Sequence, residues 1–349
     1  MSRLASDALA EPLATEAAAA ARADFRDKFS FVCCVEAGGL EEQTVRMVES
    51  LRRWGGRYAR CPVLAFTPRF GAPLARSTLD AFERLDVAYH RRRASRRSWF
   101  KFLNKPYALL EAESEVRTEQ VCWIDSDVLF LAEPSELVLG ADEDFVACAS
   151  DRNIGTTGDD EFAAYWRRVT GLFSLQLDQM PLVRTHEEQA DIRFYFNSGV
   201  FAYRARSGFA ERYLDGCIRL LDSKIASRHS GIFFTDQVTL GLVALQMKLR
   251  WRTLPLSHNY PLGSKREHAY DREKLKRCAV CHYHDALWPH FFPKFLGWLD
   301  PDFPDVTRWL REQGPLRNPA RLPWRALSRA LSEMREWQTR RFERECVIP

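Results

Sequence analysis

The sequence predicts an α/β fold in which a mostly parallel central sheet is flanked by helices. The first half of the chain alternates apolar runs of strand length with amphipathic stretches, which is typical of β-α-β units. The hydrophobic share of 46% and the charged share of 28% are those of an ordinary globular protein. A chain of 349 residues can also bury a large core. These observations favour one large α/β domain with appended segments.

The individual elements follow from the spacing of apolar residues. Residues 29–35 form a mainly apolar run and predict a buried strand. Residues 41–54 have Val45, Val48 and Leu51 at helical spacing, and Gly55 with Gly56 ends that helix. The same reasoning predicts further strands at 62–66, 87–89, 120–124, 145–149 and 200–203, and helices at 74–85, 105–115, 209–225 and 234–245.

The two ends of the chain differ in pattern from the main domain, which we expect at residues 25–300. Residues 1–24 are interpreted as a flexible or helical extension, and residues 301–349 as a helical tail. Within the tail, residues 322–345 form a basic amphipathic pattern with Leu327, Leu331 and Met334 on one stripe. A helix packed on the domain edge is the favoured interpretation, and peripheral contact with a membrane surface is the alternative.

Composition and charge exclude several classes of protein. No stretch approaches the roughly 18 consecutive apolar residues of a transmembrane helix. Residues 1–24 lack the basic start and uninterrupted apolar segment of a secretory signal. Nine cysteines without regular spacing are typical of reduced thiols, so we expect a cytoplasmic location. Because the net charge is only +4, we expect no nucleic acid partner, although the basic run at 90–101 contains two aromatic residues.

A pair of carboxylates is the strongest feature of the sequence. Asp125 and Asp127 lie one residue apart in an apolar run, directly after the predicted strand at 120–124. Ligands of parallel sheets bind outside the carboxyl ends of strands, which is where this pair lies. Two adjacent anions repel and need compensation, and Mn²⁺ or Mg²⁺ would supply it. The alternative is that the two carboxylates cap a turn.

Four segments together resemble a known family. The run around Asp125 and Asp127 resembles the Asp-x-Asp motif of glycosyltransferases with the GT-A fold. Phe196-Asn197-Ser198-Gly199-Val200, Thr235-Asp236-Gln237 and His282-Tyr283 resemble motifs of the glycogenin and bacterial lipopolysaccharide galactosyltransferase group, in the same order. The resemblance spans residues 29–290 and implies a Rossmann-like GT-A domain at residues 25–300.

The resemblance also implies roles for single residues. Asp125, Asp127 and His282 would bind the metal ion, and Ser126 would lie near the nucleotide ribose. Asn197 and Asp236 would face the transferred sugar, with Gln237 nearby. Lys105, and Lys101 as a second choice, match the basic residue that contacts the diphosphate. Where the family has a lysine after the closing His-Tyr, this chain has Trp288, so phosphate neutralisation must shift to other residues.

The expected function is therefore the transfer of a hexosyl group from a nucleotide-diphosphate sugar, UDP-sugar by preference, to a glycan, lipid or protein acceptor. Retention of the anomeric configuration is implied by the resemblance alone. The long polar and aromatic segment between the strands at 145–149 and 200–203 is expected to help form the acceptor side. A sugar nucleotidyltransferase and a non-catalytic sugar-nucleotide or polyanion binding module are the alternatives.

One competing motif overlaps the predicted metal ligand. Cys278-Ala279-Val280-Cys281-His282 matches the pattern of covalent haem attachment, and with His284 it has the ligand types of a zinc site. Haem attachment normally needs export, and no second ligand pair lies at zinc-finger spacing. We therefore interpret the two thiols as buried packing residues.

Overall fold

A seven-stranded sheet lies at the centre of the computed structural model, which describes residues 25–92 and 94–349. The strand order is β10-β6-β9-β4-β1-β2-β3. Strand β9 runs antiparallel to both of its neighbours, and all other pairs in this sheet are parallel. The predicted mostly parallel sheet is therefore confirmed. The strands are β1 (Phe29–Cys34), β2 (Val63–Thr67), β3 (Val87–Arg91), β4 (Gln120–Ile124), β6 (Phe145–Cys148), β9 (Asn197–Arg204) and β10 (Trp251–Thr253).

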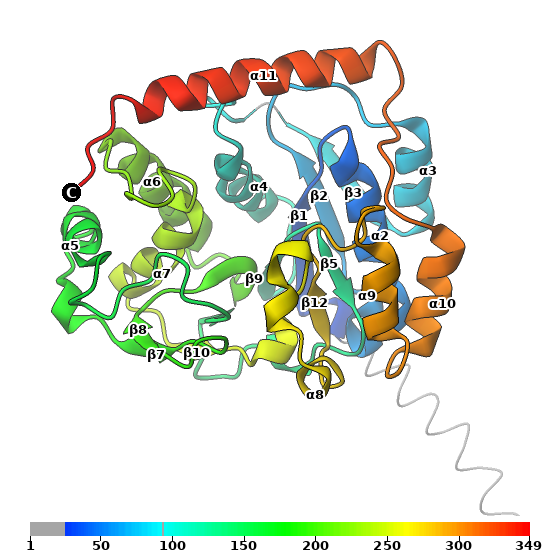
Figure 1. Ribbon diagram of the computed structural model, residues 1–349, viewed down its shortest axis with the longest axis horizontal. Helices are drawn as coiled ribbons and strands as arrows, with labels where there is room; N and C mark the ends of the chain where they lie inside the picture. Colours follow the sequence, from blue (N-terminus) through cyan, green and yellow to red (C-terminus); the bar gives the residue numbers. More distant parts are fainter. Residues whose placement is uncertain (1–24, 93) are drawn as a thin grey trace, which may run out of the picture.

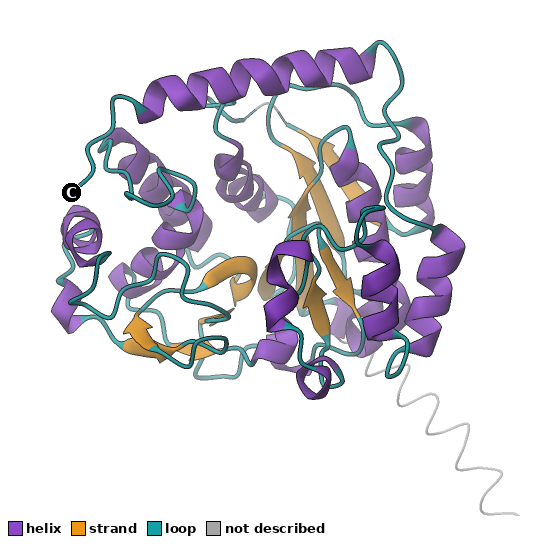
Figure 2. Cartoon of the chain, viewed as in Figure 1, coloured by secondary structure: helices purple, strands orange, loops and turns teal. Residues whose placement is uncertain are grey.

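Helices cover both faces of this sheet (Figures 1 and 2). The sequence of β1 is almost continuously apolar because this strand lies inside the sheet and is covered on both faces. Phe29 and Phe31 belong to the core cluster that contains residues of α2, while Val32 belongs to the cluster on the other face with residues of α4. The covering helices are α2 (Gly39–Trp54), α3 (Arg76–Arg84), α4 (Asn104–Glu113), α6 (Phe209–Asp222) and α7 (Thr235–Gln246).

A small second sheet was not predicted. It has the order β11-β12-β5, from β11 (Tyr260–Pro261), β12 (Val280–His282) and β5 (Val128–Phe130). These strands are only two or three residues long, so they show no periodicity that could be recognised in the sequence. Leu129, Tyr260 and Cys281 of these strands belong to a third apolar cluster, which also contains residues of α8 (Arg272–Leu275), α9 (Phe292–Leu299) and α10 (Pro304–Gln313). This sheet joins the middle of the chain to its last third.

The long segment between β6 and β9 also contains structure that the sequence pattern did not reveal. It includes helix α5 (Ala163–Leu172) and the antiparallel pair β7 (Leu182–Arg184) and β8 (Asp191–Arg193). Trp166 and Tyr195 of this segment are fully buried and pack edge to face at 5.7 Å. The segment is thus part of the folded domain.

The predicted C-terminal helix is confirmed as α11 (Trp324–Glu343), but its apolar stripe is only partly covered, with Leu327 and Leu331 half-buried. None of its 20 residues, all of which the structure describes, is buried, and Met334 is 47% exposed. Figure 1 shows α11 running across one end of the molecule, beyond α4. No helix in the described ranges is long and apolar enough to cross a lipid bilayer. The predicted extension at residues 1–24 lies outside the described residues.

Candidate active site

A cavity of about 930 Å³ opens at the carboxyl ends of β1 and β4. Because β9 runs in the opposite direction, its first residues meet the end of β4, and the backbone N–H of Asp125 donates to the carbonyl of Gly199 at 2.8 Å. The first turn of α7 reaches the same edge of the sheet. All nine residues predicted for the site line this one cavity: Lys101, Lys105, Asp125, Ser126, Asp127, Asn197, Asp236, Gln237 and His282.

Asp127, His282 and His284 form a group that fits a divalent cation. Among the described residues they are the cluster whose ligand atoms all lie within 4.8 Å of one another. Pairing of β12 with β5 creates it, since His282 lies opposite Val128 and the N–H of Tyr283 donates to the carbonyl of Asp127 at 2.9 Å. One carboxylate and two imidazoles are suitable donors for a first-row transition metal ion.

The imidazole of His282 is held in one orientation. Its Nδ1 lies 3.0 Å from Oδ1 of Asn259, whose Nδ2 donates in turn to Oδ1 of Asn197 at 2.8 Å. This chain of hydrogen bonds makes Nδ1 the protonated nitrogen and leaves Nε2 facing Asp127, 3.2 Å from its Oδ1. Gly199 is required beside the ring, because a Cβ there would lie 2.5 Å from Cε1 of His282.

The charges of Asp127 and His284 suit a cation ligand set. Burial would lower the pKa of His282, but Asp127 outweighs this effect and raises it, so a cation bound there would replace the proton on its Nε2. Although burial raises the pKa of the Asp127 carboxyl, the neighbouring His282 outweighs this effect and lowers that pKa to about 2. Burial and the neighbouring His282 lower the pKa of His284 to about 3, so this imidazole is neutral. An ionised carboxylate and a neutral imidazole are the forms in which these side chains bind metal ions. His284 also has a positive φ of 48°, which is uncommon outside glycine and typical of functional sites.

Asp125 faces a different partner from Asp127. Its Oδ1 accepts a hydrogen bond from the indole of Trp123 at 2.7 Å and lies 3.5 Å from Nζ of Lys105. Burial raises the pKa of Asp125, Lys105 opposes that rise, and the neighbouring Asp127 adds to it. The compensation that two adjacent carboxylates need therefore comes partly from the protein, through Lys105 on one side and His282 on the other.

Lys105 is buried at the floor of the cavity, with its ammonium group fully engaged. Nζ lies 2.7 Å from the carbonyl oxygen and 2.8 Å from Oγ of Ser198, and 3.0 Å from Oδ2 of Asp236. Burial alone would lower the pKa of Lys105, but Asp125 and Asp236 raise it, so the side chain stays charged. Lys105 thus links the end of β4 to the first turn of α7.

The remaining predicted residues make hydrogen bonds within the protein as well as lining the cavity. Oδ1 of Asn197 accepts from the N–H of Gly199 at 2.8 Å, in addition to Asn259, so its amide N–H groups are what remains for a ligand. The hydroxyl of Ser126 donates to the carbonyl of Cys34 at 2.8 Å. The side chain of Gln237 donates to the hydroxyl of Tyr195.

Other cations of the cavity come from separate segments. Lys101 lies on the 3₁₀ turn Lys101–Leu103, with Nζ 5.0 Å from the centre of the Phe102 ring. Lys265 and Arg266 lie on the 3₁₀ segment Ser264–Ala269 and also line the cavity. The N–H of Ser264 donates to Asp285, the residue after His284, at 2.8 Å, which holds this segment near the metal group.

Trp288, which stands where the resembling family has a lysine, packs against Gly39 instead. A Cβ on Gly39 would lie 2.9 Å from the indole ring. In the predicted basic run, Arg92 and Arg97 form ion pairs with Glu115 and Asp222. Residue 93 of that run lies outside the described residues. Two arginines of the basic run are therefore already paired with carboxylates of the protein.

The cysteines near His282 do not join the metal group. All nine cysteines of the chain fall within the described ranges and are free thiols. Cys278 and Cys281 are buried in the third apolar cluster, and burial raises the pKa of the Cys278 thiol well above its usual range. This environment agrees with their interpretation as packing residues.

Sequence reasoning missed three residues of this site. His284 was considered only as a zinc ligand beside the two cysteines, and its position two residues after His282 was the available signal. Asn259 and Lys265 gave no signal, because they lie in a part of the chain that reads as irregular. Only the folded chain brings His284 and Lys265 to the cavity and Asn259 against His282.

Comparison with known proteins identifies the family. Residues 31–248 match the family described as Rhodobacterales glycosyltransferase domain. Among solved structures, the glycosyltransferase GlyE of Streptococcus pneumoniae TIGR4 is 13% identical, with 84% of this chain and 66% of that chain covered and a TM-score of 0.46. Mouse xyloside xylosyltransferase 1 is 12% identical, with 74% and 98% covered and a TM-score of 0.41. No curated protein sequence matches. The chain belongs to the Rhodobacterales glycosyltransferase domain family, and residues 31–248 are its glycosyltransferase domain.

Proposed function

We propose that the chain transfers a sugar from a nucleotide-diphosphate sugar, UDP-sugar by preference, to an acceptor hydroxyl or other nucleophile, and that it depends on Mn²⁺ or Mg²⁺. The observation that carries the proposal is the convergence of the nine predicted residues on one cavity beside the Asp127, His282 and His284 group. With two imidazoles in that group, Mn²⁺ is preferred to Mg²⁺, which favours oxygen ligands. The GT-A assignment of the domain at residues 25–300 belongs to the same proposal.

Asp127, His282 and His284 would hold the cation, with Asp125 beside them. A cation bound there neutralises the negative charge that develops on the departing nucleoside diphosphate. Burial raises the pKa of Asp125, and Lys105 opposes that rise and so favours its ionised form. Ser126 would lie on the ribose side of the pair. The exposed Lys101 and Lys265 line the same cavity and would contact the phosphates, which would offset the absence of a lysine at Trp288.

Asp236 is proposed to stabilise the positive charge that develops on the transferred sugar. Its carboxylate lies in the first turn of α7 and is buried, where an ionised group acts strongly on a nearby charge. Lys105 and Ser198 position that carboxylate through their hydrogen bonds. The amide N–H groups of Asn197 and the side chain of Gln237 would hold the sugar hydroxyls. We propose a hexosyl donor and retention on the resemblance alone.

Thermal unfolding with a panel of sugar nucleotides, with and without Mn²⁺, tests donor binding, since a ligand of the folded state raises the melting temperature. A UDP-sugar should raise the Tm only when Mn²⁺ is present, and His284→Ala should abolish that rise. No shift with any sugar nucleotide contradicts the proposal. Release of nucleoside diphosphate from the sugar nucleotide then identifies transfer.

Two rival functions have distinct outcomes in the same assays. A sugar nucleotidyltransferase would release pyrophosphate from a nucleoside triphosphate. A binding module would bind the sugar nucleotide tightly without turnover. Neither is favoured by a separate observation, since the cavity holds the predicted acidic, amide and cationic groups of a transferase together.

Contact with a membrane surface is part of the proposal for the acceptor side. Met334 and Trp337 are 47% and 54% exposed on α11, and Arg341 lies 5.7 Å from the Trp337 ring. Amphipathic helices with aromatic and basic residues bind anionic lipid surfaces. Co-sedimentation with phosphatidylserine vesicles should fall for Trp337→Ala. Equal sedimentation of both proteins would leave a soluble glycan or protein as the acceptor.

A further inference from the structure

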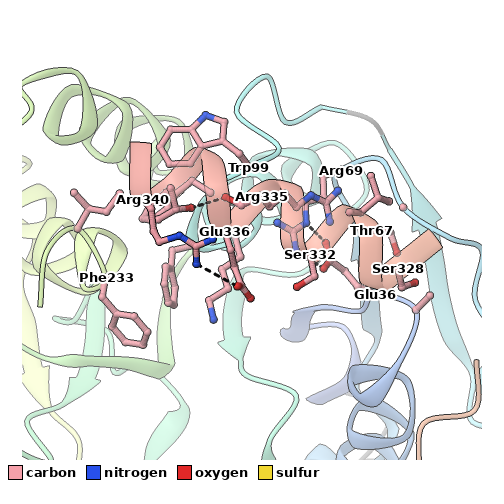
Figure 3. Close-up of a pocket in the computed structure, with 18 of the residues that line it drawn as sticks. Glu36, Thr67, Arg69, Trp99, Phe233, Ser328, Ser332, Arg335, Glu336 and Arg340 are labelled. Atoms are coloured by element: carbon pink, nitrogen blue, oxygen red, sulfur yellow. Dashed lines mark hydrogen bonds and ion pairs between the residues drawn. The ribbon is translucent and has the colours of Figure 1, made fainter. Parts of the chain in front are cut away.

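The segment between β6 and β9 reaches the active-site cavity in two ways. Asp151 and Asn153, shortly after β6, line the cavity directly. Tyr195, near the other end of the segment, reaches it through the side chain of Gln237, which lines the cavity. A second cavity, of about 500 Å³ beneath α11, is lined by other parts of the chain (Figure 3), and no residue of the fully described stretch 149–196 belongs to it. The segment therefore acts on the active-site cavity.

Tyr195 is held in place by its own segment. Its side chain is fully buried and lies two residues before β9. Trp166 of α5 packs on it edge to face, and the indole N–H of Trp166 donates to the carbonyl of Ile154 at 2.6 Å. Gly155 is also close, since a Cβ there would lie 3.1 Å from Cδ1 of the Tyr195 ring. The position of the phenol ring is thus fixed without any ligand.

The hydroxyl of Tyr195 determines how the amide of Gln237 is oriented. Nε2 of Gln237 donates to this hydroxyl, and Oε1 accepts from the backbone N–H of Ser198 at 3.5 Å. If the amide were turned over, its NH₂ group would face the N–H of Ser198, donor against donor. The contact with Ser198 is long for a hydrogen bond, so the hydroxyl of Tyr195 is the stronger of the two restraints.

The same contacts couple Gln237 to its neighbour in the first turn of α7. Oγ of Ser198 donates to Oδ2 of Asp236 at 3.0 Å, so Ser198 binds both side chains. Burial raises the pKa of the Tyr195 hydroxyl well above its usual range, and the neighbouring Asp151 adds to the rise. The phenol therefore stays neutral and serves as a hydrogen-bond partner. One N–H and one lone pair of the Gln237 amide remain for a ligand.

We propose that Tyr195 is a positioning residue of the transfer reaction, which fixes the amide of Gln237 so that it presents one donor and one acceptor to the hydroxyls of the transferred sugar. The inference rests on the proposed function. Without the hydroxyl of Tyr195, the amide would populate both of its orientations, and only one of them offers the sugar the correct atoms. The segment between β6 and β9 would thereby contribute to catalysis through a residue that does not touch the substrate.

Kinetics of the full chain test this inference, with UDP-glucose and UDP-galactose as donors, Mn²⁺ present and water as the acceptor. Tyr195→Phe removes one oxygen atom, so the rate of UDP release should fall about 3- to 10-fold, the scale of one neutral hydrogen bond. In a Gln237→Ala chain, the further change Tyr195→Phe should alter the rate by less than about twofold, because the amide that Tyr195 positions is gone. A merely structural role of Tyr195 would give the same loss in both chains.

Tyr203→Phe is the matched control. Tyr203 is also fully buried, lies on β9, and its hydroxyl has no hydrogen-bond partner among the described residues. This variant should release UDP at the wild-type rate, and thermal unfolding should show all the variants folded at the assay temperature.

Three outcomes overturn the inference. Tyr195→Phe could be as active as wild type, it could lose as much activity in the Gln237→Ala chain as in the wild type, or Tyr203→Phe could lose as much as Tyr195→Phe. In each case the wild type still releases UDP, so the proposed function stands. A wild type that releases no UDP from either donor contradicts the proposed function itself, and the inference with it.

Discussion

Asn259 accepts a hydrogen bond from Nδ1 of His282, at 3.0 Å, and so directs Nε2 of that ring toward Asp127. Asn259 is itself oriented by its amide N–H, which donates to Asn197. Asn259 and His282 lie 23 positions apart in the sequence. His282 is the last residue of β12, and Asn259 directly precedes β11 of the same small sheet. The geometry of the metal group therefore depends on a residue that does not belong to it.

Replacement of Asn259 tests this dependence. Asn259→Leu removes the acceptor that holds His282, so the affinity for Mn²⁺ should fall roughly 10- to 100-fold, as for other partners of metal ligands. Titration with Mn²⁺ followed by electron paramagnetic resonance measures it. Asn318→Ala, at an exposed asparagine away from the cavity, should bind Mn²⁺ as wild type does. Unchanged affinity in Asn259→Leu would show that packing against Gly199 alone orients the ring.

The carboxylate pair should be essential for activity but not for folding. Asp125→Asn and Asp127→Asn keep the size of the side chains while removing the charges that the cation needs, so turnover should fall by several orders of magnitude. Circular dichroism should show the wild-type fold. EDTA should inactivate the wild type, and Mn²⁺ should restore it. Wild-type turnover in either variant, together with resistance to EDTA, excludes the metal assignment.

Lys105 should matter more for catalysis than for donor affinity. Lys105→Ala leaves Asp125 and Asp236 without their shared cation, so kcat should fall by a factor that corresponds to about 2–4 kcal/mol, with a smaller change in KM. Arg97→Ala, at a residue that pairs with Asp222 instead, is the control and should change little. A rise in KM alone, with kcat unchanged, would show that Lys105 contributes to donor binding and not to the positioning of Asp125 and Asp236.

Replacing the cysteines of the Cys-x-x-Cys-His segment and replacing its histidine should have clearly different effects on activity. Cys278→Ser with Cys281→Ser should retain most activity at 25 °C but unfold at a lower temperature, because two hydroxyl groups enter an apolar cluster. His282→Ala should lose activity while keeping its fold. Stoichiometric zinc released when the thiols are modified, or haem in the purified protein, would instead make the cysteines ligands.

The ion pair between Asp144 and Arg250 predicts a specific dependence of stability on pH. The hydrogen bond from Arg250 lowers the pKa of Asp144 to about 2 from its usual 3.8, so the folded state holds the ionised form more strongly than the unfolded state. The pair therefore stabilises the fold above about pH 4 and ceases to do so as the pH falls to about 2.

Asp144→Asn should lower the free energy of unfolding at pH 7 by about 1–2 kcal/mol, a range that allows for the exposure of Arg250. Urea unfolding should show this difference shrinking between about pH 4 and pH 2. The fully exposed Asp142 provides the control, and Asp142→Asn should stay close to wild type. A difference that is independent of pH would show that packing rather than charge stabilises this pair.

Sequence patterns were reliable where the physical signal is local. The strands at 29–35 and 120–124 are buried on both faces, so their apolar runs could be read directly as β1 and β4. Asp125 and Asp127 follow β4 within the same run, which identified the edge of the sheet where the cavity lies. The helix at 322–345 was recognised from its spacing, but the spacing could not tell which face turns inward.

The sequence by itself determined the class of sheet, the edge at which chemistry is placed and most of the polar residues found there, because apolar periodicity and chain order carry that information. The tertiary structure alone decided that His284 and Asn259 join Asp127, that Lys105 joins Asp125 to Asp236, and that α11 turns Arg335 toward β2. These contacts join segments far apart in the chain through strands of two or three residues and through the packing of a C-terminal helix. Such pairings are selected by the packing of the whole core, so no local pattern in the sequence records them.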